Sequence, residues 1–172
     1  MLGRPESTEA APYYFGYIDE VSGYDVLRLL DEQLASLVPR LESISEPQSL
    51  YRYAPGKWSM REVLGHINDC ERLFTLRAFW FARGFDTALP SFDQNVAVRE
   101  ARSDAIEWAR HIDEFRATRT ATVAFFRNLP EEAWMRSGIA SDNHFTVRAL
   151  AYLAVGHVIH HWKIIEDKYL RG

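Results

Sequence analysis

Three of the chain's six histidines lie within five residues, in the stretch Gly156-His157-Val158-Ile159-His160-His161-Trp162. An α-helix turns by about 100° per residue, so His157 and His161 project one turn apart from the same apolar face, and His160 lies at the edge of that face. Two imidazoles at positions i and i+4 can bind one metal ion. The same pattern also fits two core histidines that are satisfied by hydrogen bonds. A third ligand elsewhere in the chain would favour the metal site.

His66 is the candidate third ligand, in a helix that we predict from about Ser59 to Arg83. Ser59 and Glu62 have the spacing of a capping box, in which two side chains and two backbone amides bond reciprocally. Gly84 is a typical residue at which a helix stops. On a helical wheel, His66 lies within or beside the apolar stripe that would face the core. We therefore expect it to meet the two C-terminal histidines.

Four further residues are candidates for the substrate side of this site. Cys70, one turn after His66, could approach as a fourth ligand, although a free cysteine is often buried for packing alone. Arg77 could bind an anionic thiol or substrate, or could extend along the edge of the bundle to reach solvent. Asp93 and Gln94 fall in a long predicted link and could orient a substrate there. Asp93 also fits a surface carboxylate or a cap.

Four amphipathic segments must position these side chains, because their apolar residues recur with the helical period. We predict Ser103 and Thr146 as the N-caps of the last two helices, and a kink or early end at Pro39 in the first. His111 is expected at the surface. The predicted helices cover about 22–45, 59–83, 103–128 and 146–170, with a short turn after Pro130 and connections at 46–58, 85–101 and 136–144.

This pattern predicts an all-α fold, a four-helix bundle with a long crossover link at 85–101. We expect an irregular arm at residues 1–20, and residues 136–144 to form a polar loop. The chain has 172 residues, of which 47% are apolar, enough for one domain with its own core. A net charge of −4 without a basic run gives a nucleic-acid partner no electrostatic support.

The single cysteine excludes an internal disulfide. The first residues lack the apolar region of a signal peptide, and no apolar run is long enough to span a bilayer. We therefore expect a cytoplasmic protein without a membrane partner.

Several segments together resemble the DinB/YfiT-like superfamily, over roughly residues 25–170. They are Pro55-Gly56-Lys57-Trp58-Ser59, Glu62-Val63-Leu64-Gly65-His66, Glu71-Arg72, Pro90-Ser91-Phe92-Asp93-Gln94 and the closing Gly156 to Trp162 stretch. The resemblance implies a single bundle domain over 21–172, which is often a homodimer in such proteins. It also implies a divalent ion on His66, His157 and His161, in agreement with the helical wheels.

The resemblance further implies chemistry on small molecules. Characterised relatives use a low-molecular-weight thiol, such as bacillithiol or mycothiol, to conjugate or isomerise electrophiles. We therefore expect thiol-transferase-like activity with a zinc or nickel ion, both of which suit imidazole ligands. A metal-dependent hydrolase and a non-enzymatic bundle that binds a metal or small ligand are the alternatives. The sequence assigns no catalytic residue beyond the ligands.

Overall fold

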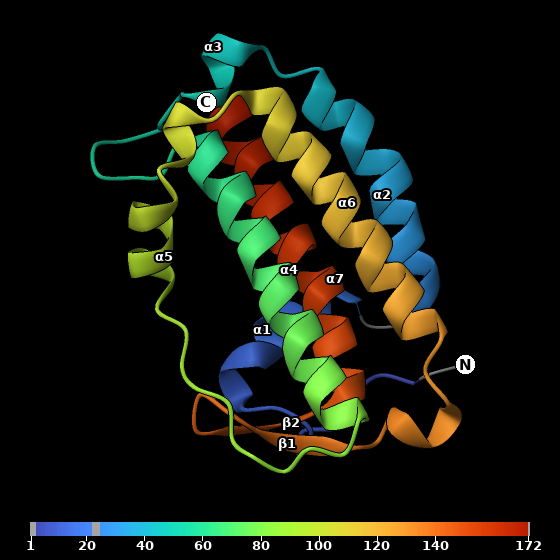
Figure 1. The fold of residues 1–172 in the computed structure, drawn as a ribbon. Coiled ribbons are helices and arrows are strands. Elements are labelled where there is room, and N and C mark those ends of the chain that lie inside the picture. The colour runs from blue at the N-terminus through green and yellow to red at the C-terminus, as the bar shows by residue number, and fades with distance from the viewer. Residues whose placement is uncertain (1–2, 22–24, 172) are drawn as a thin grey trace.

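The computed structural model describes residues 3–21 and 25–171. Four long helices form a bundle (Figure 1): α2 (Val26–Glu42), α4 (Met60–Ala82), α6 (Trp108–Arg127) and α7 (Val147–Ile164), which continues as a π-helix to Leu170. Helices α4 and α6 run in one direction, and α2 and α7 run in the other (Figure 1). The predicted four-helix bundle is confirmed. Within the described residues, no helix is both long and apolar enough to cross a membrane.

The helices that carry the histidines begin where the sequence predicts. The Ser59 side chain accepts a hydrogen bond from the Glu62 amide, and the Glu62 carboxylate accepts one from the Ser59 amide at 2.8 Å, so the capping box is present. Thr146 caps α7 by accepting from the amide of Ala149 at 3.0 Å. These caps satisfy amides that the first helical turn leaves without partners. Helix α2 contains Pro39 and ends at Glu42, between the early end predicted at Pro39 and the predicted bound of about 45.

The start of α6 differs from the prediction. Ser103 begins a short 3-10 turn instead of capping the helix, and α6 begins at Trp108. The Trp108 amide donates to a carboxylate oxygen of Glu46 at 3.0 Å, so a residue distant in sequence serves as the cap. His111 was predicted at the surface, and this is wrong. It is buried, with Nε2 lying 2.9 Å from the Ser103 carbonyl oxygen.

Both long connections contain short helices. The 46–58 segment begins with α3 (Glu46–Ser49), and the 85–101 link ends in α5 (Gln94–Ala101). The link passes along the outside of α4 (Figure 1) and forms a single bridge to the following hairpin. There the Leu89 amide donates to the carbonyl of Ile139 at 2.9 Å, and the Leu89 carbonyl accepts from the amide of Ser141 at 3.1 Å.

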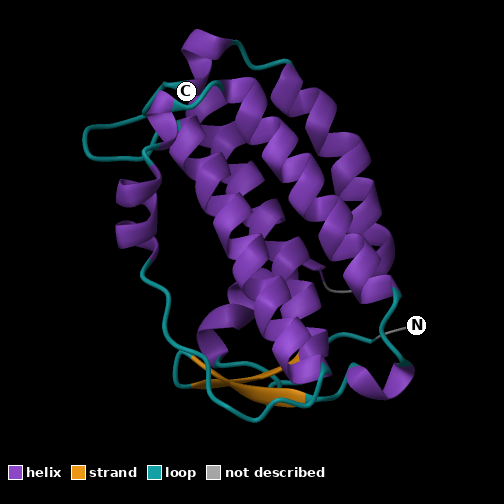
Figure 2. Cartoon of the chain, in the orientation of Figure 1, coloured by secondary structure: helices purple, strands orange, loops and turns teal. Residues whose placement is uncertain are grey.

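Residues 136–144 were predicted to be a polar loop, and this is wrong. They contribute to a two-stranded antiparallel hairpin, β1 (Ser137–Ala140) and β2 (Asn143–Thr146), which closes one end of the bundle (Figure 2). The turn residues Ser141 and Asp142 have φ angles of 50° and 58°. Two successive positive φ angles are typical of the tight turn whose twist matches that of paired strands.

The second half of the N-terminal arm is regular, in contrast to the prediction. It forms a 3-10 turn (Pro12–Tyr14), helix α1 (Phe15–Ile18) and a second 3-10 turn (Asp19–Val21). Helix α1 packs on α7, and Ile18 is fully buried. Gly156 permits this contact, because a Cβ atom there would lie 2.0 Å from the Tyr17 carbonyl oxygen. The division of the chain into an arm and one bundle domain stays a prediction.

The apolar core consists of two clusters along the bundle axis. On α7, one cluster includes residues up to Val155 and the other begins at Val158. The layer between them contains buried polar side chains, among them His66, His157, Glu71 and Arg119. The candidate site therefore lies at mid-height in the bundle, where apolar packing is interrupted.

The close approach of α1 to α7 yields a first prediction. Gly156→Ala should lower the melting temperature by several degrees, because the new methyl group overlaps a backbone carbonyl. Overpacking costs about 1–3 kcal/mol, and we expect the upper end, which exceeds the roughly 1 kcal/mol that alanine gains over glycine in a helix. Gly16→Ala is the matched control, since a Cβ atom there meets nothing within 4 Å. Equal melting temperatures for the two variants would contradict the proposed contact.

Candidate metal centre

Three imidazoles converge between α4 and α7. The Nε2 atom of His157 lies 3.1 Å from the Nε2 atoms of both His66 and His161. One ligand atom from each of the three residues can be chosen so that all lie within 4.8 Å of one another. Two nitrogens that each lie about 2.0–2.1 Å from one tetrahedral ion are separated by about 3.3 Å. The observed spacing is therefore close to that of ligands sharing an ion.

The protonation states of these histidines also fit a cation. Burial lowers the pKa of His66 to about 4, and burial together with the neighbouring histidines lowers the pKa of His161 to about 3. The same causes lower the pKa of His157 well below its usual value. Each ring is therefore neutral at pH 7 and carries one N–H. One shared hydrogen can join only two of the three nitrogens, so a cation would satisfy the set better than hydrogen bonds alone.

Aromatic rings surround the three histidines. The ring centroid of Trp58 lies 5.0 Å from that of His66, and Phe74 and Tyr17 lie 5.7 Å and 5.4 Å from His157. Rings packed edge to face restrict the orientation of the imidazoles without offering them strong acceptors. His160 is only half-buried, and its ring centroid lies 5.1 Å from that of Tyr17. It does not belong to the converging group, as the wheel predicts.

Cys70 lies beside His66 but is outside that group. Its Sγ atom is 3.6 Å from Nδ1 and 3.7 Å from Nε2 of His66, so it faces the ring and not one nitrogen. Burial, with a smaller contribution from Asp69, raises the pKa of the Cys70 thiol to about 12. The thiol is therefore protonated at neutral pH, which suits a packing role.

Of the other sequence candidates, Arg77 is buried in the bundle, whereas Asp93 and Gln94 lie at the start of α5. Arg77 is buried, so its predicted alternative role of extending to solvent is wrong; the link and the hairpin cover it. Asp93 caps α5 by accepting from the amides of Asn95 and Val96 at 2.9 and 3.2 Å. Gln94 is exposed at the first position of that helix. All three candidates line one cavity with His66 and His157.

Two cavities reach the histidines from different sides. The larger has a volume of about 380 Å³ and is lined by His66 and His157 together with residues of the arm, the link and the hairpin turn. The second, of about 270 Å³, is lined by His161 and by Tyr53, Lys57, Trp58 and Tyr169 among others. An ion held by the three nitrogens would therefore lie between two spaces that can each admit a small molecule.

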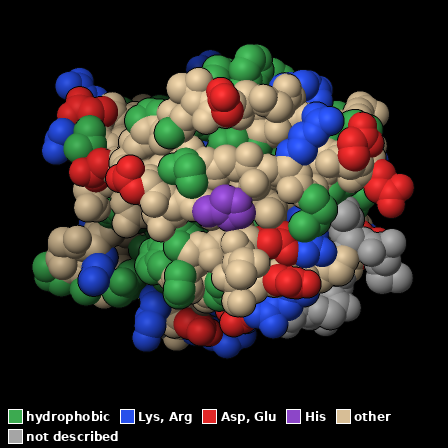
Figure 3. All heavy atoms as spheres, turned by 90° about the horizontal axis from the view of Figure 1, so that it is seen from below, with side chains coloured by type: hydrophobic (Ala, Val, Ile, Leu, Met, Phe, Trp, Pro, Cys, Tyr) green, Lys and Arg blue, Asp and Glu red, His purple; other side chains and the backbone are tan. Residues whose placement is uncertain are grey.

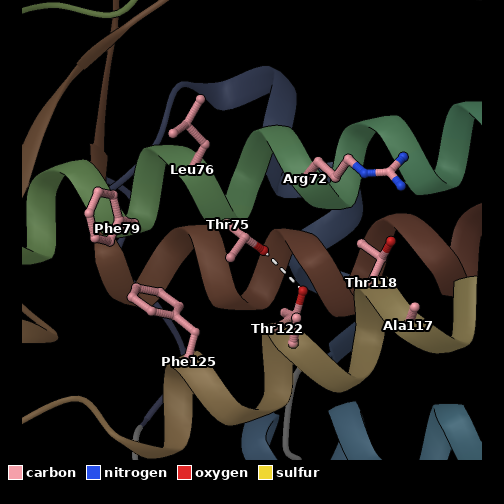
Figure 4. Close-up of a pocket in the computed structure, with 9 residues that line it drawn as sticks. Arg72, Thr75, Leu76, Phe79, Ala117, Thr118, Thr122 and Phe125 are labelled. Atoms are coloured by element: carbon pink, nitrogen blue, oxygen red, sulfur yellow. Dashed lines mark hydrogen bonds between the residues drawn. The ribbon is translucent and has the colours of Figure 1, made fainter. Parts of the chain in front are cut away.

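A larger surface groove of about 540 Å³ lies elsewhere, between α4 and α6 (Figure 4). The Thr75 and Thr122 hydroxyls meet there at 3.1 Å, with Phe79 and Phe125 nearby. Among the described residues that line this groove, Arg72 alone carries a charge. It brings together no titratable groups, so it is not a candidate for the chemistry.

Tyr17 and Ser141 are among the residues of the larger cavity that sequence reasoning missed. Tyr17 belongs to the arm that was predicted to be irregular. A glycine inside an otherwise apolar helix, at Gly156, is the signal that another segment approaches there. Ser141 occupies the hairpin turn, and no dipeptide typical of such turns indicates it.

Fold and side chains together describe a helical bundle with a candidate metal centre between two of its helices. The model of the DinB superfamily matches residues 29–165, which is most of the chain. The chain therefore belongs to the DinB superfamily. None of the curated proteins compared with it matched.

Solved structures share the fold. YfiT from Bacillus subtilis, described as a probable metal-dependent hydrolase with an unusual four-helix bundle topology, is similar with a TM-score of 0.75 and 16% identity, over 97% of this chain and 91% of YfiT. A mycothiol-dependent maleylpyruvate isomerase is similar with a TM-score of 0.65 and 12% identity, over 83% of this chain and 62% of the isomerase. The chain thus spans less than two thirds of the isomerase. At sequence identities this low, the similarity to these two proteins shows a shared fold alone.

The lowered histidine pKa values predict how the metal-free protein responds to pH. The pKa of His66 is about 4 in the folded chain, against the usual 6.5. Its contribution to stability is therefore complete above pH 6.5 and is lost as the pH falls toward 4, by up to about 1.4 kcal/mol per pH unit. Chelator-treated protein should melt at a lower temperature at pH 5 than at pH 7.

His66→Gln should reduce that difference, because glutamine does not titrate. The window from pH 7 to 5 lies above the usual titration range of carboxyl groups. A melting temperature that stays constant across this window would contradict the burial of neutral imidazoles.

Proposed function

We propose that the protein is a divalent-metal-dependent enzyme that transfers a low-molecular-weight thiol to small electrophiles, with the ion on His66, His157 and His161. The observation that carries the proposal is the convergence of three neutral imidazole nitrogens between two cavities. Zinc or nickel suits such ligands. A divalent ion on three neutral ligands supplies Lewis acidity, which lowers the pKa of a thiol or water that coordinates it.

The two cavities support a reaction with two organic partners. A conjugation needs space for a thiol and for an electrophile, whereas hydrolysis needs one organic substrate and water. His66 and His157 line the larger space, and His161 lines the other. Reactants bound on the two sides of one point would be held close together, which removes much of the entropy cost of their encounter.

Tyr17 lines the larger cavity, and its hydroxyl group lies 3.4 Å from that of Tyr13, which lines the same cavity. Burial is the main cause that raises the pKa of Tyr17 above the usual value, so this hydroxyl stays protonated throughout the neutral range. It can donate a hydrogen bond to a ligand beside His157. Its backbone is held against Gly156 of α7, and its ring packs edge to face on the rings of His157 and His160.

A metal-dependent hydrolase is the second candidate, since YfiT is described as a probable hydrolase of this fold. A bundle that binds a metal or small ligand without turnover is the third. On the hairpin end of the molecule, basic and acidic side chains are interspersed around the edge (Figure 3). That mixture supports small molecules over nucleic acids as partners. The homodimer and the cytoplasmic location stay predictions, and light scattering would test the first.

The ligand assignment predicts metal content. Protein purified without a histidine tag should contain one zinc or nickel ion per chain by elemental analysis. His161→Ala should lower that content at least tenfold, because two ligands hold an ion far less well than three. His160→Ala is the matched control and should retain the ion, since His160 lies outside the converging group. Full metal content in the His161 variant would refute the assignment.

The proposed chemistry predicts an activity that needs both metal and thiol. A chlorinated nitroaromatic compound or an epoxide, offered with cysteine-based thiols, should be conjugated by the metal-loaded protein. Chelation or His66→Ala should reduce the rate by about 100-fold or more, since an uncoordinated thiol of pKa near 8.5 is mostly protonated.

Equal conjugation with and without chelator would contradict a role for the metal. Metal-dependent cleavage of esters or amides, with no thiol supporting any reaction, would favour the hydrolase instead.

A further inference from the structure

Arg77 is a buried cation that pairs with no anionic group in the described part of the chain. Its side chain projects from α4 three turns after His66, and the residue is only 2% exposed. Two other buried arginines differ, because Arg61 pairs with Glu46 and Arg119 pairs with Glu71. Among the described residues, no carboxylate lies within ion-pair distance of Arg77. Burying a charge without a partner is costly, so such a residue in a cavity calls for an explanation.

The protein gives Arg77 neutral partners that fix its position and leave its charge uncompensated. Its Nη2 atom donates to the Ser141 hydroxyl at 2.7 Å and to the Pro90 carbonyl at 3.4 Å. The Phe145 ring centroid lies 5.8 Å from its guanidinium carbon. Its Nε atom is buried and has no hydrogen-bond partner within residues 3–21 and 25–171. Burial lowers the pKa of Arg77, although the guanidinium remains charged at neutral pH.

Arg77 lines the same cavity as His66 and His157. The carboxylate of Asp93 also lines this cavity, but it accepts hydrogen bonds from two backbone amides at the start of α5. The remaining lining residues are largely aromatic or apolar: Tyr13, Tyr14, Tyr17, Leu73, Phe74 and Phe92. The volume of about 380 Å³ is near the lower limit for small-molecule sites, about 300–1,000 Å³.

We propose that this cavity binds a small organic carboxylate, with its anionic group on Arg77 and its apolar body against the aromatic wall, directed toward the histidines. The inference rests on the proposed function only for the reaction that follows binding. A guanidinium offers a planar fork of donors that matches a carboxylate, and a buried pair of this kind binds strongly. The carboxylate can belong to the thiol or to the electrophile, and the two sources are distinguishable.

The test compares each carboxylate with its neutral amide by calorimetric titration. For the electrophile the probes are 4-chloro-3-nitrobenzoate and 4-chloro-3-nitrobenzamide; for the thiol they are 3-mercaptopropionate and 3-mercaptopropionamide. In at least one pair the carboxylate should bind about tenfold more tightly or better, as expected for a charged hydrogen bond. The pair that shows this preference identifies the source of the carboxylate. Equal binding within both pairs would overturn the proposal.

Variants assign the preference to Arg77. Arg77→Met keeps a long apolar side chain and should reduce the ratio of the two affinities to about one. Arg77→Lys keeps the charge but loses the planar fork, and should retain part of the preference. Arg72→Met is the matched control on the same helix, because Arg72 is exposed and lies outside this cavity. If Arg77→Met is folded by circular dichroism, an unchanged ratio of carboxylate to amide affinity in this variant would overturn the assignment. If the methionine variant does not fold, an unchanged ratio in Arg77→Lys would do the same.

Titrations of chelated protein and of His66→Ala separate this proposal from the metal proposal. A carboxylate preference that persists in both shows that the Arg77 site stands without an ion. If metal content is confirmed while neither pair shows a preference, the metal proposal survives and the carboxylate site is refuted.

Discussion

The buried ion pair between Arg119 and Glu71 holds the four long helices in one register. Arg119, on α6, donates to both carboxylate oxygens of Glu71, on α4, at 2.7 Å. It also donates to the Ala154 carbonyl of α7 at 3.2 Å and to the side chain of Gln33 on α2. Gln33 in turn donates to the Val155 carbonyl at 3.0 Å. Both charged side chains are almost fully enclosed, so each depends on the other, and loss of one costs about 3–5 kcal/mol. The contacts on α4 and α7 lie within two turns of the ligand histidines, and the pair therefore also sets how those histidines meet.

The sequence could predict most of the histidine site because the information is local. The capping box at Ser59 sets where α4 begins, and the apolar period of each helix determines which side chains face the core. These two regularities place His66, His157 and His161 on core-facing sides of their helices, and the packing of α4 against α7 brings them together. The bundle class follows from the same periodicity. The packing of the helices and connections against one another is harder to predict, because the sequence carries less signal for it.

Two of the features that sequence reasoning could not predict depend on partners distant in the chain, and a third lacks a local turn signal. Helix α6 begins late because Glu46 supplies its cap. Arg77 is enclosed because the link and the hairpin cover it, although its place on the helix also suits a side chain that reaches solvent. The hairpin was not predicted because its strands have only four residues each and its turn, Ser141-Asp142, contains no glycine. At α6 and at Arg77 a tertiary contact prevailed over a local preference. The link and the hairpin turn line the cavity where the further binding site is proposed.

The distance along the chain between His66 and His157 has a consequence for assembly. The two residues are 91 positions apart, whereas His157 and His161 share one helix. A nascent α7 would present two imidazoles as soon as it became helical, before the bundle formed. The third arrives only when a loop of about ninety residues closes, and closing a loop of this size costs on the order of 4–5 kcal/mol. An ion that gains its third ligand in this step would offset part of that free-energy cost. Tight retention of the ion would therefore distinguish fully folded molecules from partly folded ones.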